Sequence, residues 1–227
     1  MAIEKALCQV VVNRDLCGAQ FYSDAKTWVL DKGFAPEIAW QREQHPSNVS
    51  ESAFLREAAW VVYCSGFREA TVRKHFDYLS LCFFDWSSAA EIAENASACT
   101  TSAMLVLANR PKHQAVARIA QHIAEIGYEE FKGRFLQSPL EVFTTLPFLG
   151  PITSVHLAKN LGFDIAKPDR HLVRLKDFLG YKDVGAMCTA ISSSCGDPVR
   201  VIDLVLWRYI EQTGIWQSTK TPALYAL

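Results

Sequence analysis

The fold is decided by one stretch of the chain, residues 138–181, which reads SPLEVFTTLPFLGPITSVHLAKNLGFDIAKPDRHLVRLKDFLGY. It opens with Ser138-Pro139-Leu140-Glu141, which places an N-cap residue before a proline at the first helical position and a glutamate at the third. This is the pattern of a capping box at the start of a short helix. The turn Leu146-Pro147-Phe148-Leu149-Gly150 ends that helix, and a second one over 151–161 stops at Gly162. The stretch therefore predicts two helices joined by a five-residue hairpin.

A third helix follows the hairpin and begins at an aspartate. Lys167-Pro168 leads into Asp169, which can cap a helix over 170–179 that Gly180 ends. The helix dipole favours the ionised form of a carboxylate at that end, where it can stabilise a cationic transition state. An isolated aspartate at a helix start is an ordinary N-cap, so Asp169 becomes a specific signal only together with the hairpin.

The second hairpin helix offers a way to bind an anion. The backbone N–H groups of Gly150, Ile152 and Thr153 have no partner within the helix, and such groups bind phosphate without a basic side chain. Residues 146–182 also have a local charge of +3, from Lys159, Lys167, Arg170, Arg174, Lys176 and Lys182 against Asp164, Asp169 and Asp177. An ordinary helical hairpin with a solvated charged face would show the same spacing, so both interpretations stay open.

The remainder of the chain is dominated by helical periodicity. Apolar residues at helical spacing predict helices over 53–63, 71–81, 89–109, 113–126 and 199–212. Strand patterns are few and short, as at residues 9–12. The predicted fold class is all-α.

Composition limits the class of protein. The chain has 227 residues, of which 50% are hydrophobic and 21% charged, which suits one folded domain and excludes disorder as its main state. No apolar run is long enough for a membrane helix, and the N-terminus lacks a secretory signal, so we expect a soluble cytoplasmic protein. A net charge of -1 excludes a purely electrostatic nucleic-acid binder but allows a local basic face.

Cysteine spacing and short motifs exclude several kinds of site. Seven scattered cysteines without a CxxC pair indicate reduced thiols and neither a disulfide scaffold nor a structural zinc site. P-loop, GxSxG and HExxH motifs do not occur in the sequence.

The hairpin and the aspartate together resemble the helix-hairpin-helix (HhH-GPD) DNA glycosylase superfamily. Its hairpin is of the type Leu-Pro-Gly-hydrophobic-Gly, and an Asp, often with x-His and an Arg after it, follows a Gly/Pro-rich loop. Here these positions are Leu146–Gly150 and then Asp169, His171 and Arg174. The resemblance covers about 35 residues and implies an all-α, two-lobed fold with the hairpin and the catalytic Asp at the interlobe cleft. Lobe one would span about 50–165, with the helix-hairpin-helix at 139–161, and lobe two about 1–49 and 166–227.

Three departures from the family pattern are informative. Phe148 replaces the first hairpin glycine. Ile152 stands where the lyase-active members have a lysine, so a Schiff-base mechanism loses its nucleophile. Cys188 and Cys195 match the first interval of the iron–sulfur spacing, but the third position is Pro198 and no cysteine follows, so we expect no cluster.

The resemblance implies a monofunctional DNA glycosylase, a monomer that acts on double-stranded DNA containing a modified base. It would flip that base out and hydrolyse its N-glycosidic bond, with Asp169 stabilising the oxocarbenium charge and directing the attacking water. The phosphate contacts would come from Phe148, Gly150, Ile152, Thr153 and His171. No cofactor would be required, although the family often binds a monovalent cation through hairpin carbonyls, here those of Thr144, Leu146 and Leu149.

The segment 60–68 resembles the helix end and loop where relatives keep pocket residues and the wedge that fills the gap left by the flipped base. On this basis the candidates for the base pocket or the wedge are Trp60, Tyr63, Phe67 and Arg68. The alternative is that Gly66 is a plain helix C-cap and that Phe67 packs back onto the helix.

Two questions of function stay open at the level of sequence. The excised base could be an alkylated or oxidised base in DNA repair, or a hypermodified phage cytosine, such as glucosylated hydroxymethylcytosine, in phage defence. The alternative to an enzyme is a non-catalytic helix-hairpin-helix module that only binds DNA. Asp169 argues against that module, because binding alone does not need a carboxylate beside phosphate.

Overall fold

The computed structural model describes residues 14–215, a stretch that holds thirteen α-helices, two short 3-10 helices and no β-strand. The all-α prediction is confirmed for these residues, and the strand predicted at residues 9–12 lies outside them. The chain divides into two compact units. We call His45–Phe163 the hairpin unit, and the described parts of Met1–Gln44 and Asp164–Leu227 the Asp169 unit. The lobes expected from the sequence were about 50–165, and about 1–49 together with 166–227.

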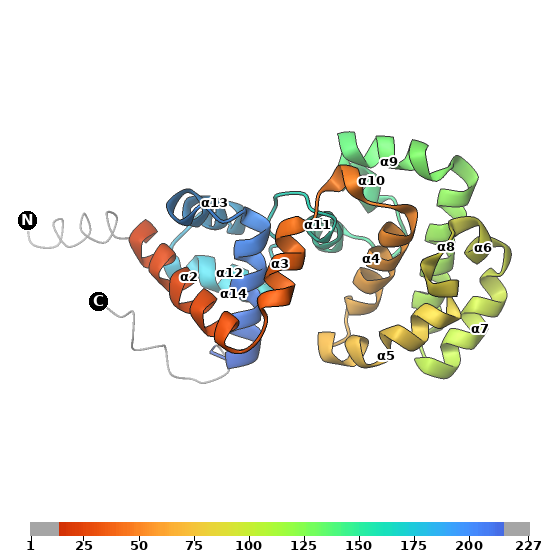
Figure 1. Cartoon of the computed structure of the whole chain (residues 1–227), viewed down its shortest axis with the longest axis horizontal. Helices are drawn as coiled ribbons and strands as arrows, with labels where there is room; N and C mark the ends of the chain where they lie inside the picture. The colour runs from red at the N-terminus through yellow and green to blue at the C-terminus, as the bar shows by residue number, and fades with distance from the viewer. Residues whose placement is uncertain (1–13, 216–227) are drawn as a thin grey trace, which may run out of the picture. The chain divides into compact units, whose positions relative to one another are not determined.

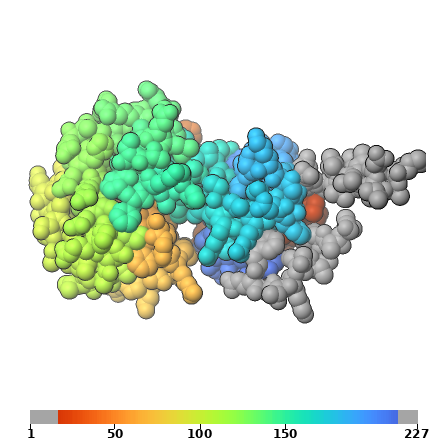
Figure 2. Space-filling view, turned by 180° about the vertical axis from the view of Figure 1, so that it is seen from behind, coloured from red at the N-terminus to blue at the C-terminus, as the bar shows by residue number. Residues whose placement is uncertain are grey.

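The hairpin unit is a cluster of eight α-helices. They are α4 (Glu51–Cys64), α5 (Glu69–Cys82), α6 (Ala89–Glu94), α7 (Ala96–Val106), α8 (Arg110–Ile126), α9 (Tyr128–Gln137), α10 (Pro139–Thr144) and α11 (Pro151–Asn160), with short 3-10 helices at Pro46–Asn48 and Phe84–Trp86. Helix α8 contacts α4, α6, α7 and α9, so it forms the centre of the unit (Figure 1). On the face shown in Figure 2, the orange to green segments of this unit pack into one continuous body.

An aromatic cluster joins the hairpin to the rest of this unit. The ring of Phe54 in α4 lies 4.8 Å from Phe131, 5.7 Å from Phe135 and 5.8 Å from Phe143, measured between ring centroids. All four side chains are buried. Because Phe143 belongs to α10, the first helix of the hairpin is held against α4 by its aromatic side chain.

Two details of the predicted helices are wrong. The helix expected over 89–109 is two helices, because Asn95 interrupts it and donates a side-chain hydrogen bond of 2.9 Å to the carbonyl of Glu91. Asparagine competes with the helical ladder in this way. Asn109 lies beyond the second helix and instead caps α8 through the N–H of Lys112. Ser138 is the N-cap of α10 by position, but its side chain makes no capping hydrogen bond.

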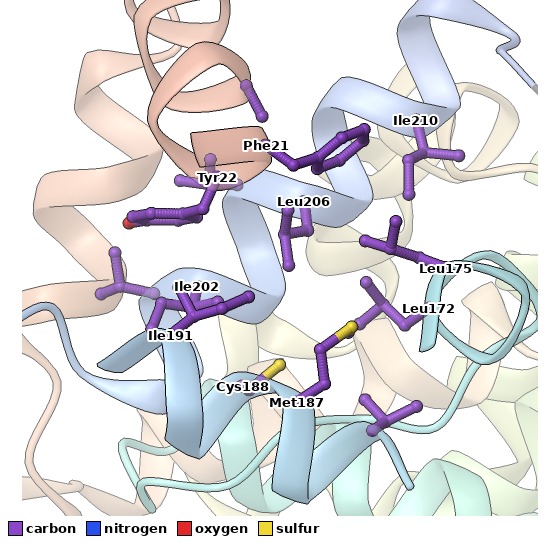
Figure 3. Close-up of a cluster of buried hydrophobic side chains, with 14 of the residues drawn as sticks. Phe21, Tyr22, Leu172, Leu175, Met187, Cys188, Ile191, Ile202, Leu206 and Ile210 are labelled. Atoms are coloured by element: carbon purple, nitrogen blue, oxygen red, sulfur yellow. The ribbon is translucent and has the colours of Figure 1, made fainter. Parts of the chain in front are cut away.

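The Asp169 unit has five described α-helices, four of which pack around α14. They are α2 (Arg14–Asp31), α3 (Ala35–Glu43), α12 (Arg170–Leu179), α13 (Val184–Cys195) and α14 (Val199–Thr213), and α14 contacts the other four. Figure 3 shows the core, to which α12 contributes Leu172 and Leu175. The helix that begins after Asp169 is therefore anchored by its apolar face.

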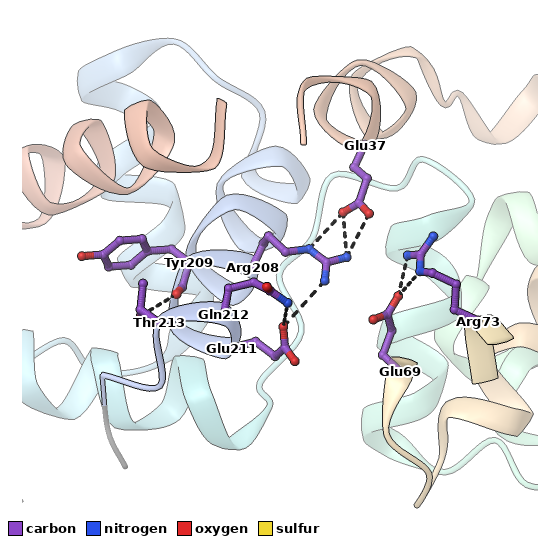
Figure 4. A network of polar contacts seen from close by, with 8 residues as sticks. All are labelled: Glu37, Glu69, Arg73, Arg208, Tyr209, Glu211, Gln212 and Thr213. Atoms are coloured by element: carbon purple, nitrogen blue, oxygen red, sulfur yellow. Dashed lines mark hydrogen bonds and ion pairs between the residues drawn. The ribbon is translucent and has the colours of Figure 1, made fainter. Parts of the chain in front are cut away.

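Two arginines of α14 hold the segments of the Asp169 unit together. Arg208 makes a bidentate ion pair with Glu37 of α3, with its shortest N–O distance at 2.7 Å (Figure 4). Arg200 donates to the carbonyls of Gln41 and Arg42 at 3.0 Å and pairs with Asp164 at 3.2 Å. Arg200 therefore ties together the two segments on which the chain leaves and re-enters this unit.

None of the described helices is long and apolar enough to cross a membrane.

A buried carboxylate links the second hairpin helix to α4. Glu57 of α4 accepts a hydrogen bond of 3.1 Å from Asn160 of α11 and one of 3.0 Å from Arg56. Burial raises the pKa of the Glu57 carboxyl, and the neighbouring Arg56 only partly opposes this shift.

The raised pKa predicts how the variant Glu57→Gln will behave. The folded state binds the Glu57 proton more tightly than the unfolded chain does, so its contribution to the free energy of unfolding falls as pH rises above the ordinary value of 4.5. Glutamine keeps an acceptor for Asn160 but cannot ionise. In urea unfolding from about pH 4 to about pH 8, we expect the variant to gain stability relative to wild type as pH rises. A difference that does not change with pH would contradict this.

Candidate functional site

The hairpin lies within the hairpin unit, where α10 and α11 pack against each other. Leu146 and Leu149 of the connecting turn are buried, and the N–H of Leu149 donates to the carbonyl of Leu146 at 3.1 Å. The hydroxyl of Thr153 lies 3.3 Å from the carbonyl of Phe148 and 3.2 Å from that of Gly150. The turn is therefore closed by its own hydrogen bonds and held by its leucines.

Phe148 occupies a backbone conformation that favours glycine. Its φ is 65°, in the left-handed region, at the position where the family hairpin has its first glycine. A residue with a Cβ pays about 1–2 kcal/mol for this conformation. The side chain is 46% exposed, so burial offsets little of that cost. The turn thus places a phenylalanine in a conformation that glycine adopts without strain.

The N-terminus of α11 presents free backbone N–H groups. Gly150 is the extended N-cap, Pro151 follows it, and the helical hydrogen bonds begin with Ser154 N–H to Gly150 at 2.9 Å. The N–H groups of Ile152 and Thr153 have no hydrogen-bond partner in the part of the chain that the structure describes. The positive end of the helix dipole coincides with these groups, which is the arrangement that binds phosphate.

The charged residues of the stretch 146–182 differ from the expectation in one respect. Lys159, counted among the basic residues of this stretch, is only 5% exposed and is no part of a basic surface. Arg170 and Arg174 of α12 are exposed, whereas Lys176 pairs with Asp177 at 2.6 Å. The exposed positive charge of this stretch therefore comes from Arg170 and Arg174 of α12 and from Lys182, all in the Asp169 unit.

The carbonyls considered for a monovalent cation lie in and beside the turn. Leu146 already accepts one hydrogen bond, and the carbonyl of Leu149 lies 3.5 Å from the Ser154 hydroxyl, while Thr144 ends α10. Each carbonyl oxygen has a second lone pair for a cation. Among the described residues there is no group of three His, Cys, Asp or Glu side chains that could hold a metal ion.

The four aromatic and basic candidates of segment 60–68 have different environments. Tyr63 is 0% exposed, and its hydroxyl hydrogen-bonds His113 at 2.8 Å, so it is a core residue and offers no face to a base. Its predicted place in a base pocket does not agree with this burial. Trp60 is half-buried, edge-on against Phe76, and Phe67 is half-buried. Arg68 is exposed, just before α5.

Lys112 was not among the residues predicted from the sequence, and its side chain reaches both the hairpin and the end of α4. Its ammonium donates hydrogen bonds to the carbonyls of Val62 and Ser65, the latter at 2.5 Å. It lies 5.4 Å from the ring centroids of both Phe67 and Phe148. The side chain is 5% exposed. One signal could have identified it, because Lys112 falls on the apolar stripe of α8 at helical spacing.

In the Asp169 unit, Asp169 is the N-cap of α12, as predicted. Its Oδ1 accepts hydrogen bonds from the backbone N–H groups of His171 at 2.9 Å and Leu172 at 3.0 Å. Its Oδ2 takes no part in the cap and lies 3.7 Å from the ammonium of Lys167. The side chain is 14% exposed. One carboxylate oxygen is thus fixed by the helix, and the other pairs with Lys167 outside the cap.

A second buried aspartate, also missed from sequence, supports this arrangement. Asp203 of α14 is 1% exposed and accepts a 2.6 Å hydrogen bond from the backbone N–H of Lys167. The N–H of Asp169 donates to the carbonyl of Lys167 at 2.8 Å. Asp203 therefore anchors the turn that presents Asp169. An acidic residue inside the apolar run of α14 was the available signal.

His171 contacts Asp169 through its backbone and not through its ring. The ring Nε2 lies 3.3 Å from Nε of Arg170, and the buried Nδ1 has no partner among the described residues. Burial lowers the pKa of His171, and the nearby Asp169 only partly opposes this. At neutral pH the ring is therefore uncharged and would bind phosphate only as a neutral donor.

Comparison with protein-family models, curated proteins and solved structures gives no match for this chain. Support for a function therefore comes from the residues of the chain itself, chiefly the hairpin and the Asp169 carboxylate.

The strained turn predicts an unusual order of stability at position 148. Phe148→Gly removes both the ring and the backbone strain, whereas Phe148→Ala removes the ring and keeps the strain. We expect the glycine variant to be more stable than the alanine variant by about 1 kcal/mol in urea unfolding. Equal stability, or a more stable alanine variant, would show that the turn does not impose the left-handed conformation.

Proposed function

We propose that this chain is a monofunctional DNA glycosylase of the helix-hairpin-helix type, which flips a modified base out of double-stranded DNA and hydrolyses its N-glycosidic bond. The observation that carries the proposal is the Asp169 carboxylate, with one oxygen held by the backbone of α12 and the other outside the cap. Its place after a helix-hairpin-helix adds to this support.

Asp169 acts on charge that develops at the sugar. As the bond between C1′ and the base nitrogen breaks, its electron pair leaves with the base and C1′ becomes part of an oxocarbenium ion. The ionised carboxylate stabilises that cation and accepts a proton from the water that attacks C1′. The products are the free base and an abasic site, with the leaving base taking up a proton.

The hairpin binds the DNA backbone without regard to the base sequence. The open N–H groups of Ile152 and Thr153, with that of Gly150, donate to a phosphate next to the flipped nucleotide. Phe148 of the same turn adds to this contact. In the Asp169 unit, His171 and the exposed Arg170 and Arg174 of α12 offer separate groups for phosphate binding. Because backbone N–H groups bind phosphate without a basic side chain, this contact is compatible with a net charge of -1.

Strand cleavage by a lysine is not part of this proposal. Ile152 occupies the position of the lyase nucleophile. Two lysines close to candidate residues are engaged, since Lys112 donates to two backbone carbonyls and Lys167 pairs with Asp169. A Schiff base would require a free, neutral amine.

In the finer detail we propose, the fold is the two-lobed glycosylase fold, and the protein acts as a cytoplasmic monomer on duplex DNA. A damaged base and a hypermodified phage cytosine both fit the chemistry of Asp169, because both leave from C1′ by the same bond cleavage. A substrate panel distinguishes them.

The test is base release from duplexes containing alkylated purines, oxidised purines, deaminated pyrimidines or glucosylated hydroxymethylcytosine. We expect wild type to release one class of base and to leave a site that breaks only after alkali. Asp169→Asn should lower the rate by at least about 100-fold. Asparagine is itself a good N-cap, so the variant should keep the fold.

The matched control is Asp183→Asn, which neutralises another N-cap aspartate of the Asp169 unit, the one that caps α13. This variant should release base at the wild-type rate. Equal losses in both variants would mean that Asp169 is only a structural cap. DNA binding without base release from any duplex would favour the non-catalytic binding module, and strand breaks without alkali would contradict the absence of a lysine nucleophile.

A further inference from the structure

A hollow of about 440 Å³ lies within the hairpin unit, beside the last turns of α5, and we call it the α5 hollow. Its lining residues come from α4, α5 and the 3-10 helix Phe84–Trp86, and they are Arg56, Asp77, Ser80, Leu81, Asp85 and Trp86. This volume is within the range of ligand sites in proteins. None of these residues belongs to the hairpin or to the groups proposed to act on DNA.

The wall of the α5 hollow is held by hydrogen bonds and ring contacts. The indole N–H of Trp86 donates to the Ser80 hydroxyl at 2.8 Å, and that hydroxyl donates to the carbonyl of Phe76 at 2.9 Å. The buried ring of Trp86 stacks on Phe83, with the two centroids 5.2 Å apart. These contacts make the wall rigid, and a rigid site loses little conformational entropy when a ligand binds.

The turn that carries Asp85 is strained. Phe84, Asp85 and Trp86 have φ of 54°, 48° and 62°, so three successive residues with a Cβ lie in the left-handed region. Such conformations persist where the surroundings over-determine them, and they are often found at functional sites. Here the buried rings of Phe83 and Trp86 hold the turn, which places Asp85 at the hollow.

The charge of the α5 hollow is negative. Asp77 and Asp85 are exposed, and neither makes an ion pair with a residue that the structure describes. Arg56, which also lines the hollow, pairs with Glu57 at 3.0 Å. Two aspartate charges therefore remain to bind a cationic group, and they would repel a phosphate.

Apolar side chains continue from the hollow along α5. Leu81 lines the hollow and is 66% exposed, and the exposed Tyr78 precedes it by three residues on the same face of the helix. Exposed apolar groups with charged residues around them are typical of interaction sites. The surface therefore suits a ligand that is longer than the hollow and carries apolar groups next to a positive charge.

We propose that the α5 hollow binds a peptide segment of a partner protein in which an arginine stands beside a large apolar residue. Asp77 and Asp85 bind the guanidinium, whose five donors suit carboxylates, and Tyr78 and Leu81 contact the apolar side chain. Arginine and tyrosine are among the residues that contribute most to protein interfaces. This inference is separate from the proposed reaction on DNA, because it uses none of the same residues.

The experiment begins with a display library of short random peptides, which is selected on the complete wild-type chain and depleted on the Asp77→Asn/Leu81→Ser/Asp85→Asn protein. We expect the enriched peptides to share an arginine next to a large apolar residue. The depleting variant should keep the fold, because all three side chains are exposed and asparagine tolerates the left-handed conformation at position 85.

A synthetic peptide from this selection is then titrated against single proteins by fluorescence anisotropy. Leu81→Ser and Asp77→Asn/Asp85→Asn should each weaken its binding by at least about tenfold. The matched controls are Leu136→Ser and Glu94→Gln/Glu125→Gln, which change exposed side chains of the same unit outside the hollow. Both controls should bind the peptide as wild type does.

Replacing the arginine of the peptide by citrulline, its uncharged analogue, isolates the ionic contact. On wild type the citrulline peptide should bind at least about tenfold more weakly than the arginine peptide, and on Asp77→Asn/Asp85→Asn the two peptides should bind alike. The same loss on both proteins would show that the arginine contacts another group, and it would overturn the assignment of the two aspartates.

Other outcomes would overturn the proposal as a whole. These are a selection that enriches no peptide, and enriched peptides that lack a basic residue. A wild-type chain that dimerises in sedimentation, with the dimer lost in Leu81→Ser, would assign the surface to a second copy of the chain. Base release is measured separately, and it should be the same in wild type and in the variants of the hollow, so either proposal can fail without the other.

Discussion

The hydrogen bonds that hold the Asp169 carboxylate are the constraint on which the proposed chemistry depends. Two backbone N–H groups at the start of α12 hold Oδ1, and this leaves Oδ2 in one orientation. Other contacts in the same unit hold these groups in place. Leu172 and Leu175 pack α12 into the core, and the buried Asp203 accepts a hydrogen bond from the turn before α12. In the proposed reaction this carboxylate would both cap a helix and face the sugar, which requires rigidity, because a misplaced charge stabilises a transition state poorly.

In the hairpin unit, α4 plays the equivalent supporting role. It holds α10 through the contact of Phe54 with Phe143 and holds α11 through the hydrogen bond between Glu57 and Asn160. Its last turn also receives the ammonium of Lys112, which lies beside the strained Phe148. Strain tends to persist where the surroundings over-determine a conformation, and such places are often functional. The hairpin turn has this strain, at Phe148.

Local patterns in the sequence predicted most of the helices, because apolar spacing and caps act within a few residues. The helix 170–179 with its Asp169 cap has the expected bounds, and the helix over 53–63 differs by two residues or fewer at each end. Contacts between distant segments were not predictable in this way. The burial of Tyr63 and the partners of Lys112 and Asp203 depend on which helices meet, and periodicity does not encode that.

The central claim, that Asp169 stabilises positive charge at the sugar, can be tested without knowing the excised base. Two duplexes serve for this, one with a cationic pyrrolidine in place of the sugar of an abasic site and one with its neutral tetrahydrofuran counterpart. Wild type should bind the cationic duplex more tightly, on the order of 100-fold, because it mimics the charge of the transition state. Asp169→Asn should lose most of this preference. The same ratio of affinities in both proteins would contradict a catalytic role for Asp169.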